Sequence, residues 1–188
     1  FEMVGVIYST KRPKADQSPY ESIDAGLASC TGLSFMLIDA CRSVGIPARF
    51  VGTPMWYNNS GNHSWVEIWD NGWHFTGAFE PTGDRLNEGW FASLAARAVE
   101  GHPEYGIYAA TWKKTGVFFP MDWKPGVEKY YAYDVTKSYQ KYLDDNFVPL
   151  RLKVVGKNGM RKKVLVNVKA DNGFSFSGFS KDERNDAN

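Results

Sequence analysis

The pattern of apolar and polar positions predicts one buried helix in the first third of the chain. An apolar run follows Ser29-Cys30-Thr31-Gly32 and continues to Val44, where Gly45-Ile46-Pro47 ends it. A helix that is apolar on nearly all sides is buried, and glycine followed by proline is typical of a helix C-terminus. Residues 11–29 are rich in proline, glycine and polar side chains, and they predict a loop with one short helical turn around residues 21–25.

Strand-like segments follow the helix. We expect one strand over residues 48–53 and two more over residues 63–70 and 73–80, which are separated by Asn71-Gly72. Asn-Gly is the preferred pair for a two-residue type I′ turn. Such a turn would place His63 directly opposite Glu80, with their Cβ atoms roughly 4.5–5.5 Å apart. A loop of three or four residues would change this register.

The pattern changes to a period of two from residue 146 onward. Apolar residues alternate with polar ones over residues 148–154, 164–168 and 174–176, which predicts three strands. Three strands are too few for a closed sandwich. We therefore expect residues 146–188 to be a β-strand segment of a larger β-module, for instance an immunoglobulin-like one, and residues 1–145 to be the main domain.

Composition excludes several classes of protein. The chain has 188 residues, two cysteines and three histidines, with a net charge of +1. Two cysteines are too few for a disulfide-dense fold, and without a CxxC pair they do not suggest a structural zinc site. The near-neutral balance gives no reason to expect a nucleic-acid partner, and no run approaches the roughly 18 apolar residues of a membrane helix.

Charge is nevertheless distributed unevenly. Residues 1–150 carry 13 Lys and Arg against 17 Asp and Glu, a net charge of −4, whereas residues 151–188 carry 9 against 4, a net charge of +5.

The chain begins at Phe1 without a signal-peptide pattern. We therefore expect flanking domains in a longer parent protein.

The two cysteines occupy different positions on the predicted helix. Cys30 lies in its first turn, where free N–H groups and the helix dipole stabilise a thiolate and lower its pKa. The backbone N–H groups of Cys30 and Thr31 could also bind a developing oxyanion. Cys41 lies eleven residues further along, about 16 Å away at a rise of 1.5 Å per residue, so the two cannot form a disulfide. We interpret Cys41 as a core residue.

A thiol nucleophile needs a base and a group that orients the base. His63 is our candidate base and Glu80 our candidate orienting carboxylate. Asp70 and Asp84 are alternatives, but Asp70 lies at the other end of the strand and Asp84 lies beyond Pro81.

The other two histidines have structural interpretations. His74 is expected to be structural or to lie on the rim of the site, and His102 to lie in a loop. A metal site made of His63, His74 and Glu80 is conceivable, but no HExxH-like spacing supports it. We therefore expect no metal and no cofactor.

Aromatic residues close to His63 are candidates for substrate binding. Trp56 and Tyr57 precede the histidine strand on an exposed-looking loop, and Trp65 alternates onto the face of His63. Ordinary packing in an aromatic-rich domain is the alternative for all three residues.

Three sequence blocks carry a family resemblance. They are Ser29-Cys30-Thr31-Gly32-Leu33-Ser34 with the segment that ends in Gly45-Ile46-Pro47-Ala48-Arg49, then Asn62-His63-Ser64-Trp65-Val66-Glu67-Ile68-Trp69, then Trp73-His74-Phe75-Thr76-Gly77-Ala78-Phe79-Glu80-Pro81-Thr82. Together they resemble the cysteine helix, histidine strand and acid strand of the transglutaminase-like superfamily, which includes microbial cysteine proteases and amidases. The family commonly has Asp where this chain has Glu80.

The resemblance implies an α+β fold with a papain/transglutaminase-like core, in which the buried cysteine helix packs on an antiparallel sheet. It implies a Cys30–His63–Glu80 triad, no metal, and acyl transfer through a thioester on a peptide, protein or other amide substrate. By resemblance we also expect a secreted, periplasmic or cell-surface location.

We favour hydrolysis, as by a protease or amidase, over cross-linking, because hydrolysis needs no second substrate site and the chain shows no calcium-loop pattern. The alternative is a catalytically inactive scaffold that binds a peptide or glycan through its aromatic loop.

Overall fold

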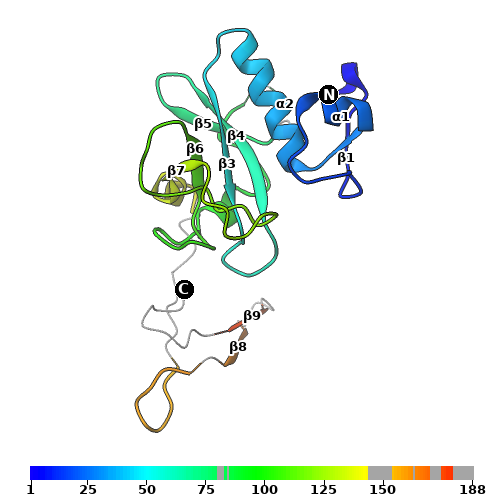
Figure 1. Cartoon of the computed structure of the whole chain (residues 1–188). Helices are drawn as coiled ribbons and strands as arrows, with labels where there is room; N and C mark the ends of the chain where they lie inside the picture. Colours follow the sequence, from blue (N-terminus) through cyan, green and yellow to red (C-terminus); the bar gives the residue numbers. More distant parts are fainter. Residues whose placement is uncertain (80–82, 84, 144–153, 163, 170–174, 180–188) are drawn as a thin grey trace.

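The computed structural model describes residues 1–79, 83, 85–143, 154–162, 164–169 and 175–179. Its main feature is a five-stranded sheet in the order β5-β4-β3-β6-β7, in which every neighbouring pair is antiparallel (Figure 1). The strands are β3 (Ala48–Thr53), β4 (His63–Trp69), β5 (Trp73–Thr76), β6 (Tyr108–Thr111) and β7 (Tyr131–Asp134).

Helix α2 (Cys30–Ser43) packs on one face of this sheet, as the apolar run predicts. Its buried residues Leu33 and Met36 share a core cluster with Phe50 of β3 and Val66 of β4. The helix ends where Gly45 adopts a left-handed conformation with a φ of 81° and the Ile46 N–H donates to the Cys41 carbonyl over 2.9 Å. The prediction of an α+β fold with a buried cysteine helix on an antiparallel sheet is confirmed.

The chain before α2 is folded into a small unit beside the start of that helix. It contains η1 (Glu2–Val4), β1 (Ile7–Tyr8), α1 (Pro19–Ala25) and β2 (Leu27–Ala28), and β1 pairs with β2 in parallel. A capping box between Ser18 and Glu21 starts α1, which extends the short helical turn predicted there. Buried Gln17 donates to the carbonyls of Glu21 and Leu27, each over 3.1 Å, and so fixes the segment that leads to Cys30.

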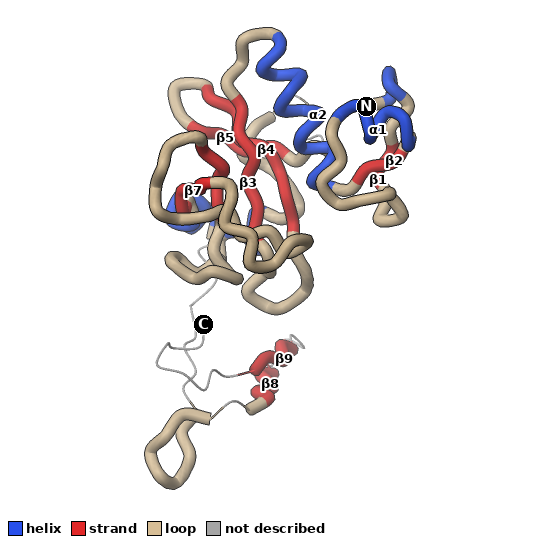
Figure 2. The backbone as a smooth tube through the Cα atoms, in the orientation of Figure 1, coloured by secondary structure: helices blue, strands red, loops and turns tan. Residues whose placement is uncertain are grey.

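Shorter helices cover the opposite face of the sheet. They are α3 (Ala92–Ala95), α4 (Thr136–Tyr139) and η2 (Gln140–Tyr142). Figure 2 shows the strands as a central layer with α2 along one side. Alternation along each strand divides the core into two clusters, so that Val66 faces α2 whereas its neighbour Trp65 packs with Tyr139 of α4. Within the described residues, no helix has the length and apolar character needed to span a bilayer.

The C-terminal segment contains an antiparallel pair of strands, β8 (Leu165–Lys169) and β9 (Ser175–Phe179). Two of the three predicted strands are therefore present. Each begins one residue later than predicted, and β9 extends to Phe179. The first predicted strand, at residues 148–154, lies almost entirely outside the described residues, and so does the predicted boundary near residue 146.

The hairpin of β4 and β5 corrects the predicted register. Trp69 pairs with Trp73, so the loop has three residues rather than two. A type I′ turn needs a positive φ at both central residues. Here the φ of Asn71 is 50°, but the φ of Gly72 lies outside the left-handed region. The extra loop residue shifts the pairing by one position. The prediction that residue 80 stands directly opposite His63 is therefore wrong, because β5 ends at Thr76. Glu80 lies outside the described residues.

The crowding around Gly52 gives a test of this packing. Gly52 is the second-last residue of β3, the central strand of the sheet. A Cβ atom there would meet the His63 carbonyl oxygen at 3.0 Å and both the Phe119 ring and the Ser64 hydroxyl at 3.4 Å. We expect Gly52→Ala to lower the free energy of unfolding by about 1–3 kcal/mol, because the added methyl overpacks a closed site. Urea denaturation measures this, with Gly72→Ala as the matched control, since a Cβ at Gly72 meets only an ordinary contact at 3.7 Å. Equal stabilities for the two variants would contradict the packing described here.

Candidate active site

Cys30 is the first residue of α2, and it is held against the beginning of β4. The Thr31 and Ser64 hydroxyls lie 3.2 Å apart in a buried hydrogen bond that joins the helix N-terminus to the strand. Ser64 also contacts Cys30, through both its backbone N–H and its hydroxyl. Because Ser64 directly follows His63 in the chain, this contact brings the cysteine to the start of the histidine strand.

Burial controls the acidity of Cys30. Desolvation raises the pKa of its thiol above the ordinary value, and hydrogen bonds from Ser64 and Thr31 act in the opposite direction without cancelling it. The expectation that the helix N-terminus lowers this pKa is therefore wrong, since loss of water outweighs the local donors. The resting residue is a neutral thiol, so attack on a carbonyl requires a base.

His63 lies in an aromatic enclosure. Its ring centroid is 5.8 Å from Trp65, 5.0 Å from Trp90, 4.9 Å from Phe91 and 6.1 Å from Trp56. Only 6% of the residue is exposed. This burial lowers the pKa of His63 to about 4, because the apolar surroundings disfavour the imidazolium. At neutral pH the side chain is consequently an uncharged imidazole, the form that accepts a proton.

A buried polar network supports the enclosure from behind. The Tyr139 hydroxyl donates to Glu67 over 2.6 Å and accepts a hydrogen bond from Trp65 Nε1 over 2.8 Å. Glu67, 3% exposed, also forms an ion pair with Arg49 at 2.6 Å. The Arg49 guanidinium lies over the Trp73 ring, 3.9 Å from its centroid. The polar atom of the Trp65 side chain, Nε1, is thereby satisfied, and this hydrogen bond fixes the indole that stacks on His63.

Sequence reasoning did not identify Ser64, Glu67 or Tyr139 as part of this arrangement. One local signal was available, since Glu67 is a charged residue at the position of a strand that alternates onto the face of His63. Tyr139 gave no local signal, because it is separated from Glu67 by 72 residues of sequence.

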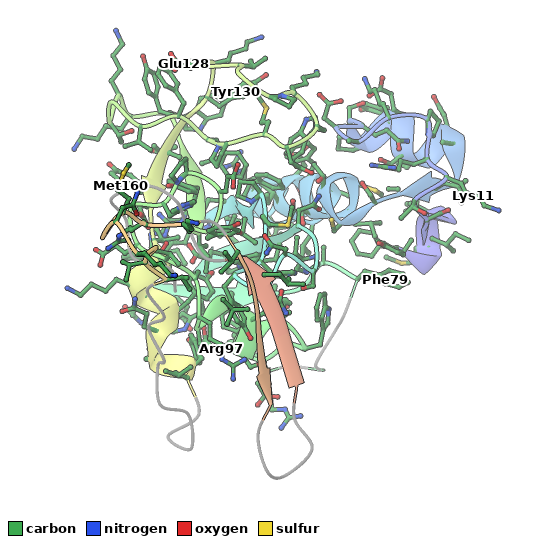
Figure 3. The ribbon with its side chains drawn as sticks, turned by 90° about the horizontal axis from the view of Figure 1, so that it is seen from below. Lys11, Phe79, Arg97, Glu128, Tyr130 and Met160 are labelled. Carbon is green, nitrogen blue, oxygen red and sulfur yellow. The ribbon has the colours of Figure 1, made fainter. Side chains whose placement is uncertain are left out.

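The predicted substrate-binding aromatics are less exposed than expected. Trp56 is only 3% exposed and stacks on fully buried Trp65, with 6.1 Å between ring centroids. This contradicts an exposed Trp56 and favours ordinary packing for both tryptophans. Tyr57 is partly buried, and its hydroxyl accepts a hydrogen bond over 3.3 Å from Arg97, which is labelled in Figure 3.

The remaining histidines are held by structural contacts. His74 pairs with Ile68 across the sheet, so it lies on the face opposite His63, and the Asn87 amide donates to its Nδ1 over 2.8 Å. His102 Nδ1 accepts the backbone N–H groups of Glu104 and Tyr105 within its loop. These positions agree with the structural interpretation of both residues.

Neither alternative acidic residue is found next to His63 among the described residues. Asp70 is exposed in the β4–β5 loop, at the opposite end of β4 from His63, and Asp84 lies outside the described residues. No group of three His, Cys, Asp or Glu suited to a metal ion occurs among the residues that the structure describes. The conceivable site with His63 and His74 is not assembled, because the two rings lie on opposite faces.

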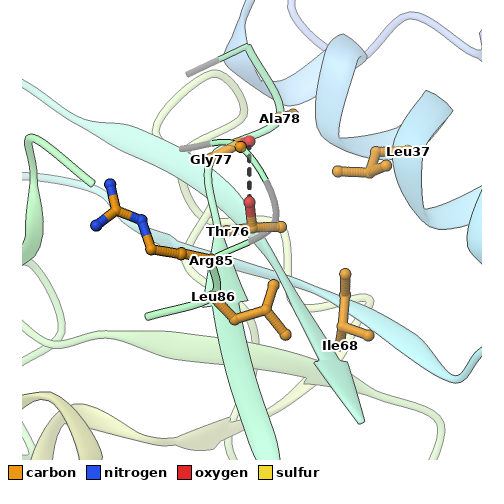
Figure 4. Close-up of a pocket in the computed structure, with 8 residues that line it drawn as sticks. Leu37, Ile68, Thr76, Gly77, Ala78, Arg85 and Leu86 are labelled. Atoms are coloured by element: carbon orange, nitrogen blue, oxygen red, sulfur yellow. Dashed lines mark hydrogen bonds between the residues drawn. The ribbon is translucent and has the colours of Figure 1, made fainter. Parts of the chain in front are cut away.

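A hollow of about 420 Å³ lies between α2 and the β4–β5 side of the sheet (Figure 4). Leu37, Ile68 and Leu86 give it apolar walls, and the Thr76 hydroxyl donates to the Gly77 carbonyl over 3.4 Å. Arg85 is the one charged side chain among its described lining residues.

Comparison with known families adds an independent observation. Residues 4–78 match the model of the Transglutaminase-like superfamily core. The matched segment contains α1, α2 and the strands β3, β4 and β5, and therefore both Cys30 and His63. Searches of curated proteins and of solved structures found no match.

The contact between Ser64 and Cys30 yields a prediction. We expect Ser64→Ala to raise the pKa of the Cys30 thiol further, because the variant removes a hydroxyl hydrogen bond that favours the thiolate. The rate of iodoacetamide alkylation as a function of pH measures this pKa, with exposed Ser138→Ala as the control. An unchanged alkylation profile would show that Ser64 does not act on the sulfur.

Tyr139 offers a second prediction. Tyr139→Phe keeps the ring but leaves Glu67 and Trp65 Nε1 each without one buried partner. We expect the free energy of unfolding to fall by about 2–3 kcal/mol. Thermal and urea unfolding measure it, and Tyr133→Phe on β7, 39% exposed, provides the matched control. A loss no larger than that of the control would contradict the network.

Proposed function

Because residues 4–78 form a transglutaminase-like superfamily core, we propose that this chain is a cysteine-dependent acyl-transfer enzyme that acts on carboxamide or peptide bonds. The observation that carries the proposal is the position of Cys30. A partly buried thiol at a helix N-terminus is held, through Ser64 and Thr31, to the first residues of the strand that bears an uncharged buried histidine. Nucleophile and base are thus anchored on rigid elements.

In the proposed reaction, the Cys30 sulfur attacks the carbonyl carbon while His63 accepts the thiol proton. The negative charge develops on the carbonyl oxygen, where the N–H groups of Cys30 and Thr31 can stabilise it. The tetrahedral intermediate then breaks its carbon–nitrogen bond, and His63 returns the proton to the departing amine. A thioester remains on Cys30.

The second half of the reaction releases the acyl group. Water attacks the thioester carbonyl, gives its proton to His63, and the carbon–sulfur bond breaks as the proton returns to the sulfur. The products are a carboxylic acid and the regenerated thiol. We propose hydrolysis rather than cross-linking because hydrolysis needs no site for an amine co-substrate.

The electrostatics of the pair favour this general-base route. Both groups are uncharged at rest, because burial raises the pKa of Cys30 and lowers that of His63. Proton transfer then creates a transient imidazolium inside an apolar enclosure, which needs a nearby carboxylate. We propose Glu80 for that role, on the resemblance of its segment to the acid strand of the family.

Selective alkylation tests the nucleophile. We expect iodoacetamide to modify Cys30 at least tenfold faster than Cys41, because Cys30 is more exposed and has hydrogen-bond donors at its sulfur, whereas Cys41 is buried. Peptide mapping by mass spectrometry gives the two rates. Cys30→Ala should also abolish cleavage of a peptide library. Equal alkylation of both cysteines would contradict the proposal.

The pH dependence tests the base. A general base is active when deprotonated, so kcat/KM should fall as pH decreases through about 4, the pKa of His63, and not near 6.5. His63→Ala should lower kcat by about 10²–10⁴-fold. His74→Asn, on the other face of the sheet, is the matched control. Because kcat/KM reports the free enzyme, an acid limb near pH 6.5 would show that burial does not set the pKa of His63.

A further inference from the structure

A larger hollow of about 780 Å³ lies along α2 on the side of β6 and β7. Aromatic and aliphatic side chains form its floor. They are Phe35, Ile38, Phe50, Phe119, Met121 and Trp123. Phe50 stands at the centre, with its ring centroid 4.9 Å from Phe35, 5.1 Å from Phe119 and 6.4 Å from Trp123. The groove is large enough for several side chains of an extended peptide.

Two aromatic residues on the lip of the groove are exposed to solvent. Trp112, which directly follows β6, is 87% exposed, and Tyr130, labelled in Figure 3 on the loop that leads into β7, is 48% exposed. Large exposed aromatics beside an apolar hollow are typical of a binding surface, because each buries much area at little cost in conformational entropy.

The charges around the groove are almost fully compensated. Lys14 pairs with Glu21 at 2.6 Å, and Lys124 pairs with Asp16 at 2.7 Å. These pairs neutralise the α1 side of the rim.

The remaining two charged side chains of the groove, Asp39 and Arg42, lie on α2 and differ in their contacts with the rest of the protein. Arg42 donates from Nε and Nη2 to the Ala48 carbonyl at 3.0 and 2.8 Å. Exposed Asp39 has no ion-pair partner within 4 Å among the described residues. The groove therefore presents an available carboxylate on the α2 side. On the other lip, Lys129 already lies over the Tyr130 ring, 5.5 Å from its centroid. A cationic ligand group is thus favoured beside Asp39 rather than beside Tyr130.

The floor of the groove reaches the proposed active site. A Cβ at Gly52 would touch both Phe119, on the floor, and the Ser64 hydroxyl, which contacts Cys30. Asp39 lies nine residues beyond Cys30 on α2, about 13 Å away at 1.5 Å per residue. An extended peptide covers this distance in about four residues.

We propose that the groove binds the peptide substrate, with an apolar side chain on the aromatic floor and a Lys or Arg beside Asp39. This inference rests on the proposed function, because it assigns the substrate class of the same site. The long aliphatic stem of a Lys or Arg packs on the aromatic floor while its charged end meets the carboxylate. The enzyme would therefore favour apolar segments that carry a positive charge about four residues from the bond that is cut.

Peptide binding to the Cys30→Ala variant tests this proposal without any chemistry. The probes are three fluorescein-labelled hexapeptides that share a Leu-Phe pair and carry lysine, alanine or glutamate directly after it. Fluorescence anisotropy at low salt gives the dissociation constants. We expect the lysine peptide to bind about three- to fivefold more tightly than the alanine peptide, and the glutamate peptide to bind most weakly.

Substitutions separate the two parts of the groove. Asp39→Asn should remove the preference for lysine and leave the affinity for the alanine peptide unchanged, and Asp39→Lys should invert the preference. Trp112→Ala should weaken all three peptides to a similar extent. Asp24→Asn, an exposed carboxylate of α1 outside the groove, is the matched control and should behave like the parent.

The outcomes distinguish this proposal from the proposed function. Three results would show that the groove is not the substrate site, whatever the reactivity of Cys30. They are that none of the peptides binds, that the preference for lysine persists in Asp39→Asn, or that light scattering shows a dimer that depends on Trp112. If the peptides bind as expected while Cys30 alkylates no faster than Cys41, the groove assignment stands and the proposed chemistry fails.

Discussion

The alternation of side chains along β4 is the constraint on which the rest of the structure depends. Successive residues of a strand point to opposite faces, so Ser64 faces α2 and bonds to Thr31, whereas His63, Trp65 and Glu67 face the opposite core cluster. One short strand therefore contacts the thiol through Ser64 and carries the imidazole at its first residue. Because each face is closed by its own set of helices, neither group can move without disturbing a packed core.

Exclusion of water then determines the chemistry of both groups. Four aromatic rings around His63 keep it uncharged, and burial keeps Cys30 a thiol despite its place at a helix N-terminus. In the reaction that we propose, the proton is therefore transferred during the attack, and the pair does not start as a preformed ion pair. The Glu67 network behind Trp65 supports the enclosure with hydrogen bonds of 2.6 and 2.8 Å and a close ion pair to Arg49.

Local patterns predicted the elements well and the contacts between them less well. The apolar run gave the position of α2, and alternation placed β3 and the start of β4 correctly. The register of the next strand was wrong because it depends on the φ of a single residue, Gly72, which composition does not determine. Trp56 resembles a surface residue in sequence, but it is buried by stacking on Trp65. Tyr139 joins the site through a contact across 72 residues, which no local pattern encodes.

The central claim is that aromatic burial holds His63 uncharged at the start of the strand that contacts the Cys30 thiol. NMR titration of the histidine ring resonances tests it most directly, with His63→Gln to assign the signal among the three histidines. The account predicts a His63 midpoint near pH 4, well below that of a solvated histidine at about 6.5. A midpoint at or above 6.5 in the folded protein would mean that burial does not set the pKa of the ring, and would contradict the account.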